Sequence, residues 1–276
     1  MTMKIIEPSE LIINPDGSVF HLHLLPQQLT DRIILVGDPG RVDLVASFFD
    51  TRDWTVQSRE FKTVGGTLRG TPVMCLSHGI GPDNIDIVIT ELDALANINF
   101  NTRTVNPTHR TLEMVRIGTS GALQPDLPLG TPVIACKSIG FDGVLNYYAG
   151  RNEVSDLEYE AALCAHTDWN PLWAKPYVVD ADPELVSLIG RDDMVHGNTI
   201  SAVGFYGPQG REVRLPLANP MLNSRIESFR HLGNRITNYE MESAPLQGLG
   251  KLKGHKAMTV CSIIANRMNH NSTPNY

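Results

Sequence analysis

Apolar residues, many of them β-branched, recur along the chain in short and nearly continuous runs. Such runs are typical of strands that a sheet buries on both faces. Helical segments lie between them: Pro39 stands near the start of 39–49, and an Asp-Asn pair of the capping type opens 82–96. The segment 238–249 is interpreted as a shorter, proline-containing helix. The runs that predict strands are "RIILVGD" (32–38), "TPVMCLSHG" (71–79), "EMVRIGTSG" (113–121), "TPVIACKSIGF" (131–141), "NTISAVGF" (198–205) and "KAMTVCSIIA" (256–265).

The alternation of strands with helices predicts an α/β architecture. The 276 residues are enough for a substantial core, and the 42% hydrophobic and 19% charged content is that of a globular rather than a disordered chain. We find no linker, internal repeat or low-complexity block. We therefore expect a single domain over residues 1–276.

The net charge of −7 argues against nucleic acid as a partner, because proteins that track a phosphate backbone need a basic excess. No apolar stretch reaches the length of a membrane span, and the N-terminus lacks an apolar signal core, so we expect a cytoplasmic protein without a membrane partner. The cysteines are far apart in the sequence and are expected to be free thiols in a reducing compartment. They are Cys75, Cys136, Cys164 and Cys261.

Glycines follow four of the predicted strands, in "VGDPG", "SHGIG", "RIGTSG" and "SAVGF". Ligands of open α/β sheets gather at the carboxyl ends of the strands, where glycines let backbone N–H groups approach an anion. Neither GxGxxG nor GxxxxGK[ST] occurs, so the sequence does not indicate a dinucleotide or a P-loop nucleotide. A smaller anion fits the pattern.

Several arginines stand near these glycines. A lone arginine is more often a solvated surface charge. Arg116, however, lies within the apolar run "MVRIG", where an unpaired charge would be costly and an anion is the expected partner. Arginine is the preferred bidentate partner of phosphate oxygens, and a threonine hydroxyl with glycine amides would complete a tetrahedral shell. The residues that we expect to bind phosphate are Gly37, Arg41, Arg59, Arg116 and Thr119.

Two further pairs have other chemical potential. Glu240 and Glu242 would not share a helix face, so they do not predict an acid–base pair. One of them is expected to be solvated or structural, and the other to point into a pocket and accept hydrogen bonds from a vicinal diol. His21 and His23 would share a strand face, as metal ligands can, but no third ligand follows at a useful spacing, and we expect no metal.

The stretch "GFYGPQGREVRL" (204–215) places Gln209 and Arg211 among glycines and a proline. Taken alone, it predicts a turn with polar side chains on its surface. The two residues gain a more specific interpretation only together with the other motifs.

Seven motifs follow one another within a match that runs from about residue 18 to about residue 268: "VFHL", "GDPGR", "SREF", "GIG", "RIGTSGA", "FYGPQGR" and "NYEMESA". In this order they resemble the nucleoside phosphorylases of the uridine phosphorylase type. The resemblance implies a single α/β domain with a central mixed, barrel-like sheet flanked by helices. It also implies phosphorolysis of uridine to uracil and α-D-ribose 1-phosphate, with inorganic phosphate as co-substrate and no cofactor.

The same resemblance carries over roles residue by residue. The phosphate residues keep their role, with Arg59 reaching phosphate from a neighbouring subunit. His21 would also cross over, to the ribose 5′-hydroxyl. Met241 and Glu242 would hold the ribose, Glu242 through its 2′- and 3′-hydroxyls. A homodimer is therefore the expected minimal active unit, and bacterial relatives commonly build hexamers from such dimers.

Uracil presents O2 as an acceptor, N3–H as a donor and O4 as an acceptor. Gln209 can accept from N3–H and donate to O2, while Arg211 donates to O4. Cytosine reverses this edge. The resemblance places Phe205 beside the base or ribose, and Arg267 as a second arginine that packs near the pair. The residues expected to act in catalysis are Arg116, Gln209, Arg211 and Glu242.

Some features favour or leave open alternatives. Related purine phosphorylases carry an aspartate after the last strand, where this chain has Ile263 and Ile264, which favours a pyrimidine. A purine nucleoside phosphorylase or nucleosidase on the same fold, and an inactive nucleoside-binding protein, remain as alternatives. The segment 97–114 is interpreted as a surface insertion, and His78 as a structural rather than a catalytic histidine.

Overall fold

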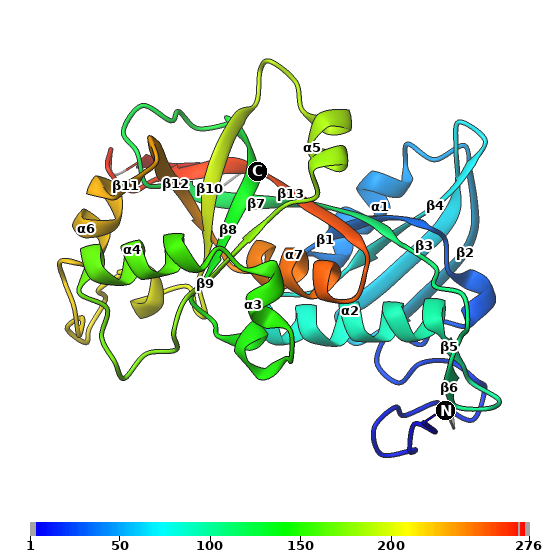
Figure 1. The fold of residues 1–276 in the computed structure, drawn as a ribbon. Coiled ribbons are helices and arrows are strands. Elements are labelled where there is room, and N and C mark those ends of the chain that lie inside the picture. Colours follow the sequence, from blue (N-terminus) through cyan, green and yellow to red (C-terminus); the bar gives the residue numbers. More distant parts are fainter. Residues whose placement is uncertain (1–3, 270, 274–276) are drawn as a thin grey trace.

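The computed structural model describes residues 4–269 and 271–273, and Figure 1 shows a twisted sheet with helices packed around it. Near its middle, β1 (Arg32–Val36) pairs in parallel with both β4 (Thr71–Ser77) and β7 (Glu113–Ala122). Beyond β4 the sheet continues antiparallel through β3 (Phe61–Leu68) to β2 (Thr51–Ser58). This half of the sheet is open.

The other half closes into a barrel. β7 pairs with β13, β13 with β8, β8 with β10 and β10 with β12, and β12 returns to β7. The β8–β13 and β7–β12 pairs are antiparallel and the other three are parallel. The predicted α/β fold with a mixed, barrel-like sheet is thus confirmed, whereas the domain limits of 1–276 stay a prediction. The bounds are β8 (Pro132–Gly140), β10 (Val195–Ser201), β12 (Asn234–Glu240) and β13 (Lys256–Asn266).

Helices cover the sheet on both sides. α2 (Pro82–Asn97) and α7 (Ser243–Leu252) lie side by side against one face, and α1 (Pro39–Ala46) packs on β3 and β4 (Figure 1). Buried side chains of α2, α7 and β1 belong to one apolar cluster. The remaining elements are η1 (Pro26–Gln28), β5 (Ile98–Asn99), β6 (Thr104–Val105), η2 (Val144–Tyr147), α3 (Arg151–Val154), α4 (Leu157–Thr167), β9 (Tyr177–Asp180), α5 (Pro183–Ile189), η3 (Gly207–Gln209), α6 (Leu222–Ser228), β11 (Arg230–His231) and β14 (Asn271–Ser272).

The six apolar runs all contribute strands, and the helices expected over 39–49 and 82–96 are present. The helix expected over 238–249 is wrong in its first part. Residues up to Glu240 belong to β12, because the barrel buries this strand on both faces and pairs it with β10 and β7. The helix begins only at Ser243. Pro245 therefore stands in its first turn, where a missing N–H breaks no helical hydrogen bond.

The segment 97–114 contains the small β5–β6 hairpin. Arg103 in its turn donates from Nε to the Ile6 carbonyl over 2.7 Å, and the Ile6 N–H donates back to the Arg103 carbonyl over 2.8 Å. Phe100 packs against the apolar cluster beneath α2. This segment therefore fastens the N-terminal stretch to the rest of the chain.

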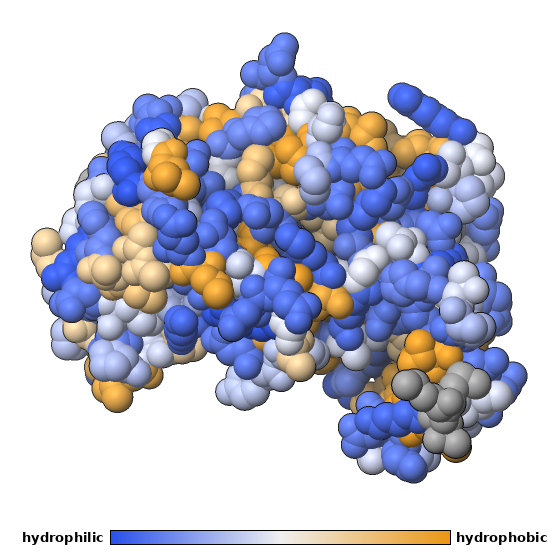
Figure 2. Space-filling model, in the orientation of Figure 1, coloured by the Kyte–Doolittle hydropathy of each residue, from blue (hydrophilic) through white to orange (hydrophobic). Residues whose placement is uncertain are grey.

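The surface and the thiols agree with the composition. On the face drawn in Figure 2, hydrophilic side chains predominate and hydrophobic ones form small scattered groups. The four cysteines, all inside the described part of the chain, are free thiols. Within that same part, none of the helices combines the length and the apolar character needed to cross a membrane.

Candidate functional site

A cavity of about 990 Å³ opens where the carboxyl ends of β1, β4, β7, β10 and β12 meet. Its volume lies at the upper end of the range for small-molecule sites, roughly 300–1,000 Å³. The cavity lies where the sequence predicted a ligand site, at the carboxyl ends of strands that are followed by glycines. The predicted site residues that line it are Gly37, Arg41, Arg116, Thr119, Phe205, Gln209, Arg211, Met241 and Glu242.

Arg116 lies on β7 and is buried, with 4% of its surface exposed. Its Nη1 donates to Glu240 Oε2 over 2.8 Å, and its Nη2 donates to Glu242. Burial opposes the charge of Arg116, but Glu242 and Glu240 hold its pKa above the ordinary value. The sequence predicted that this buried arginine needs an anion, and the chain itself supplies two carboxylates.

Glu240 is the last residue of β12 and fixes the turn into α7. Its carboxylate accepts hydrogen bonds from Ser201 Oγ over 2.6 Å, from Ser243 Oγ over 2.7 Å and from the Glu242 N–H over 2.8 Å. It is thus structural, as one of the two glutamates was expected to be. It is not solvated, because 4% of its surface is exposed.

Glu242 precedes the first residue of α7 and is also buried. Its Oε1 accepts a hydrogen bond from the Gly81 N–H over 2.8 Å, while Oε2 contacts Arg116. Burial raises the pKa of Glu242, and the nearby Arg116 opposes this effect. Gly81 has a φ of +98°, a conformation that favours glycine, so the loop after β4 can present its N–H to this carboxylate.

Gly37 makes room for the guanidinium of Arg41. A Cβ at Gly37 would lie 3.1 Å from Arg41 Nη2 and 3.3 Å from the Gly79 carbonyl oxygen. Thr119, three residues after Arg116 on β7, lines the same cavity. Two guanidinium groups, a hydroxyl and close backbone therefore share one part of the cavity wall, which is a donor set suited to an oxyanion.

The Gln209–Arg211 pair forms another part of the wall. Arg211 Nη1 donates to Gln209 Oε1 over 2.6 Å and also to the Phe205 carbonyl, and its guanidinium carbon lies 3.8 Å from the Phe205 ring centre. Burial, together with the neighbouring Arg267, lowers the pKa of Arg211 to about 10. Gln209 is buried. The bend at Gly210, with a φ of +70°, brings Arg211 back over Gln209.

Three predicted site residues do not line this cavity. Arg267 lies behind the Gln209–Arg211 pair, where its Nη2 donates to the Gly210 carbonyl over 3.2 Å. His21 contacts Glu91 Oε1 through Nδ1 over 2.6 Å. Arg59 occupies the β2–β3 turn, with its guanidinium carbon 5.9 Å from the ring centre of Phe20, the neighbour of His21. His21 and Arg59 are thus grouped together, outside the chain's own cavity.

The structure adds polar residues that the sequence reasoning missed. Glu60 and Asn84 line the cavity, and Asn84 Nδ2 donates to Glu60 Oε1 over 3.2 Å. Both stand inside or beside quoted motifs, "SREF" and "GIG", which is the signal that could have identified them. Ile264 also lines the cavity, whereas Ile263 points into the core. No group of three or more potential metal ligands occurs among residues 4–269 and 271–273.

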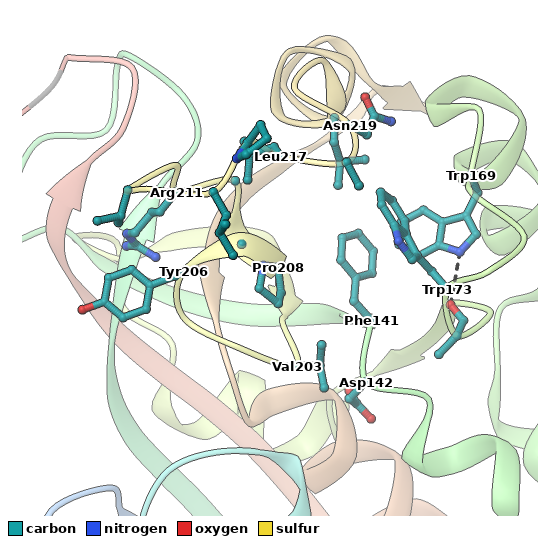
Figure 3. Close-up of a pocket in the computed structure, with 18 of the residues that line it drawn as sticks. Phe141, Asp142, Trp169, Trp173, Val203, Tyr206, Pro208, Arg211, Leu217 and Asn219 are labelled. Atoms are coloured by element: carbon teal, nitrogen blue, oxygen red, sulfur yellow. Dashed lines mark hydrogen bonds between the residues drawn. The ribbon is translucent and has the colours of Figure 1, made fainter.

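A second cavity, of about 760 Å³, lies on the other side of the loop that carries Gln209 and Arg211. Figure 3 shows its aromatic wall, Phe141, Trp169 and Trp173, opposite Tyr206 and Arg211. Arg211 borders both cavities. The loop therefore has one polar face toward the first cavity and one largely apolar face toward the second.

Comparisons with known proteins agree with this arrangement. The family model described as the phosphorylase superfamily matches residues 31–275. The uridine phosphorylase of Thermococcus kodakarensis is 30% identical over 262 residues, which cover 92% of this chain and 79% of that protein. The uridine phosphorylase of Escherichia coli is 30% identical over 91% of this chain and 87% of its own length. A solved Trypanosoma brucei nucleoside phosphorylase, described as showing uridine phosphorylase activity, superposes with a TM-score of 0.85 at 27% identity, over 95% of this chain and 92% of that one.

Proposed function

Because the chain belongs to the phosphorylase superfamily, we propose that it is a uridine phosphorylase, a pentosyltransferase that converts uridine and inorganic phosphate to uracil and α-D-ribose 1-phosphate. One observation carries the proposal: the Gln209–Arg211 pair shares a cavity with Arg41, Arg116 and Thr119. The residues proposed to hydrogen-bond uracil and those proposed to bind phosphate therefore line the same cavity.

Phosphate binds to Gly37, Arg41, Arg116 and Thr119 in this proposal, with Arg59 supplied by a second copy of the chain. The close approach of Arg41 to Gly37 and the position of Thr119 on the same wall support this role. Arg116 keeps one Nη2 hydrogen beyond its contact with Glu242. A phosphate dianion at this point completes its donor set.

Ribose lies between the phosphate and the base, against Met241 and Glu242. Glu242 accepts hydrogen bonds from the 2′- and 3′-hydroxyls through lone pairs beyond those that hold Gly81 and Arg116. His21 of a second copy reaches the 5′-hydroxyl. The buried position of Glu242 supports this role, because a buried carboxylate strongly favours hydrogen-bond donors as partners.

Uracil is read by Gln209 and Arg211 beside Phe205, while Arg267 supports the pair from behind. The 2.6 Å contact from Arg211 leaves Gln209 Oε1 a second lone pair for uracil N3–H, and directs its amide nitrogen elsewhere, toward O2. Arg211 keeps donors for O4. Sites built on such buried hydrogen bonds reject mismatched analogues, by roughly 10⁴ in good cases.

The reaction needs no nucleophile from the protein. A phosphate oxygen attacks C1′, the C1′–N1 bond breaks through an oxocarbenium-like state, and the bonding pair leaves with the base. Negative charge then spreads over N1, O2 and O4 of uracil. Arg211 and Gln209 are aimed at O4 and O2, so they stabilise a charge that grows only as the bond breaks.

The proposal includes a homodimer as the minimal active unit, because His21 and Arg59 lie together outside the chain's own cavity. It also includes catalysis without a cofactor and a cytoplasmic location. The reaction chemistry supports catalysis without a cofactor, since attack by phosphate on C1′ requires neither a redox change nor a covalent enzyme intermediate.

The test is release of uracil from uridine with and without inorganic phosphate, with inosine as the matched substrate. Phosphate-dependent release of uracil, without release of hypoxanthine, is the expected result. Release from inosine would favour the purine alternative, and release without phosphate would favour a nucleosidase. Binding of uridine without turnover would favour the inactive nucleoside-binding protein.

A further inference from the structure

His78 follows β4 directly and is fully buried, with no exposed surface. The backbone N–H of His78 donates to the Val36 carbonyl over 2.8 Å, which fixes the backbone beside Gly37. A Cβ at Gly37 would lie 3.8 Å from His78 Cε1. The imidazole is therefore packed behind the part of the cavity wall that Gly37, Arg41 and Arg116 form, although it does not line the cavity itself.

The hydrogen bond between the His78 ring and Arg116 indicates which ring nitrogen of His78 carries the proton. Arg116 Nε donates to His78 Nε2 over 3.1 Å. An arginine nitrogen cannot accept a hydrogen bond, so His78 Nε2 accepts through its lone pair. A neutral ring then carries its proton on Nδ1, which is buried and has no hydrogen-bond partner among the described residues. Burial, and after it the charges of Arg116 and Arg41, lower the pKa of His78 well below its ordinary value. The histidine is held neutral.

With this contact, each of the three guanidinium nitrogens of Arg116 donates at least one hydrogen bond. Nε is held by His78, Nη1 by Glu240 and Cys261, and one Nη2 hydrogen by Glu242. A planar guanidinium has five N–H bonds. Among residues 4–269 and 271–273, four of these N–H bonds have partners, and the fifth, on Nη2, is available to a ligand. Its direction is set by the groups that hold the rest of the plane.

The charges near Arg116 explain why a neutral imidazole suits its Nε–H better than a carboxylate would. Arg41 and Arg116 contribute two positive charges to this wall, and Glu240 and Glu242 contribute two negative ones. Asp38 and Glu60 also line the cavity. A carboxylate on Arg116 Nε would make the wall more negative and would repel a phosphate dianion. An imidazole satisfies the same N–H without adding charge.

We propose that His78 is a positioning residue for the phosphate site, whose unprotonated Nε2 orients Arg116 so that the free Nη2 hydrogen faces phosphate. The proposal rests on the proposed function, in which Arg116 binds phosphate. His78 contacts no substrate and acts through Arg116. Its removal should therefore weaken phosphate binding and leave the reading of uracil unchanged.

Two variants separate this role from simple packing. His78→Leu keeps the bulk but removes the acceptor, whereas His78→Gln places an amide oxygen near the position of Nε2. We expect His78→Leu to raise the KM for phosphate about tenfold or more, with the KM for uridine changed about twofold or less. We expect His78→Gln to recover most of the phosphate affinity. Isothermal titration of inorganic phosphate alone should follow the same order.

Equal KM values for phosphate in wild type, His78→Leu and His78→Gln would overturn the proposal, and so would equal loss of affinity for both substrates. A wild type without phosphate-dependent turnover would instead count against the proposed function. If His78→Leu fails to fold, ¹⁵N NMR of histidine-labelled wild type tests whether Nε2 of His78 is the unprotonated ring nitrogen that the proposal requires. The neutral tautomer with the proton on Nδ1 is expected, and a proton on Nε2 would overturn the assignment.

Discussion

Arg211 Nη1 lies 2.6 Å from Gln209 Oε1, so the two polar side chains of the loop after β10 form one hydrogen-bonded unit. Each fixes the orientation of the other: Arg211 determines which end of the Gln209 amide holds the oxygen, and Gln209 holds the guanidinium over Phe205. Their contributions to turnover should therefore be coupled.

Arg211→Ala and Gln209→Ala should each lower kcat/KM for uridine by about 10²–10³, because each removes a donor aimed at charge that develops on uracil. The double variant should lose less than the product of the two single losses, since the residues act as a unit. Arg214→Ala is the matched control, because Arg214 belongs to the same loop but lines the second cavity. An unchanged preference for uridine over inosine in either single variant would show that the loop does not read the base.

Arg116→Ala should abolish phosphate-dependent cleavage and also destabilise the fold. Removal of the guanidinium leaves Glu240 and Glu242 buried beside each other, and loss of one partner of a buried ion pair costs about 3–5 kcal/mol. The free energy of unfolding in urea measures this. Arg235→Ala is the control, because Arg235 and Asp126 form an exposed pair whose loss should cost less than about 1 kcal/mol. Equal stability losses in the two variants would contradict the buried arrangement.

His78 predicts a pH dependence of stability. Its folded-state pKa lies well below the ordinary value of 6.5, so the unfolded chain binds a proton first as the pH falls. The contribution of neutral His78 is fully present above pH 6.5 and is lost below it, with a slope of up to about 1.4 kcal/mol per pH unit.

The measurement for His78 is the free energy of unfolding between pH 7.5 and about 5.5, in wild type and in His78→Gln. The slope of the wild type should be the steeper one. Burial raises the pKa of Asp142 to about 6, so this group titrates in the same range, but it is common to both proteins and cancels in the difference. Parallel stability curves would mean that His78 titrates in the folded state as it does in the unfolded one.

Part of this arrangement could be predicted from the sequence because it depends on local pattern. Strands that end in glycine placed Gly37 and Thr119 at one edge of the sheet, and the resemblance placed Gln209 and Arg211 beside it. The joint hold of Glu240 and Glu242 on Arg116 could not be predicted in this way. It depends on the closure of the barrel through β12 and β7, a long-range pairing that leaves no local signal. The same closure explains why Asn238 to Glu240 form a strand where the local sequence favours a helix.

His21 and Arg59 show a different limit. Their motifs were recognised, and the structure groups them around Phe20, but their proposed target lies in a second copy of the chain. A contact between two chains has no counterpart within one chain, so the sequence pattern of one chain does not encode it locally.

Mixing two inactive variants tests this assignment. A chain with Arg59→Ala keeps its own Arg41, and a chain with Arg41→Ala can still contribute its Arg59 to the partner. In a heterodimer, the cavity of the first chain then receives a full set of arginines, whereas the cavity of the second lacks both. Half of the dimers in a random mixture are heterodimers, so about one quarter of all sites should be active.

Each variant alone should be nearly inactive, and co-expression should restore phosphate-dependent uracil release to about one quarter of the wild-type level per chain. A mixture of two Arg59→Ala preparations carrying different tags controls for effects of the mixing itself. Activity that stays at the level of the separate variants, in a mixture in which the tags prove that heterodimers form, would place Arg59 in the site of its own chain. In that case one chain would hold the complete phosphate site, and the grouping of Arg59 with Phe20 would have to open when phosphate binds.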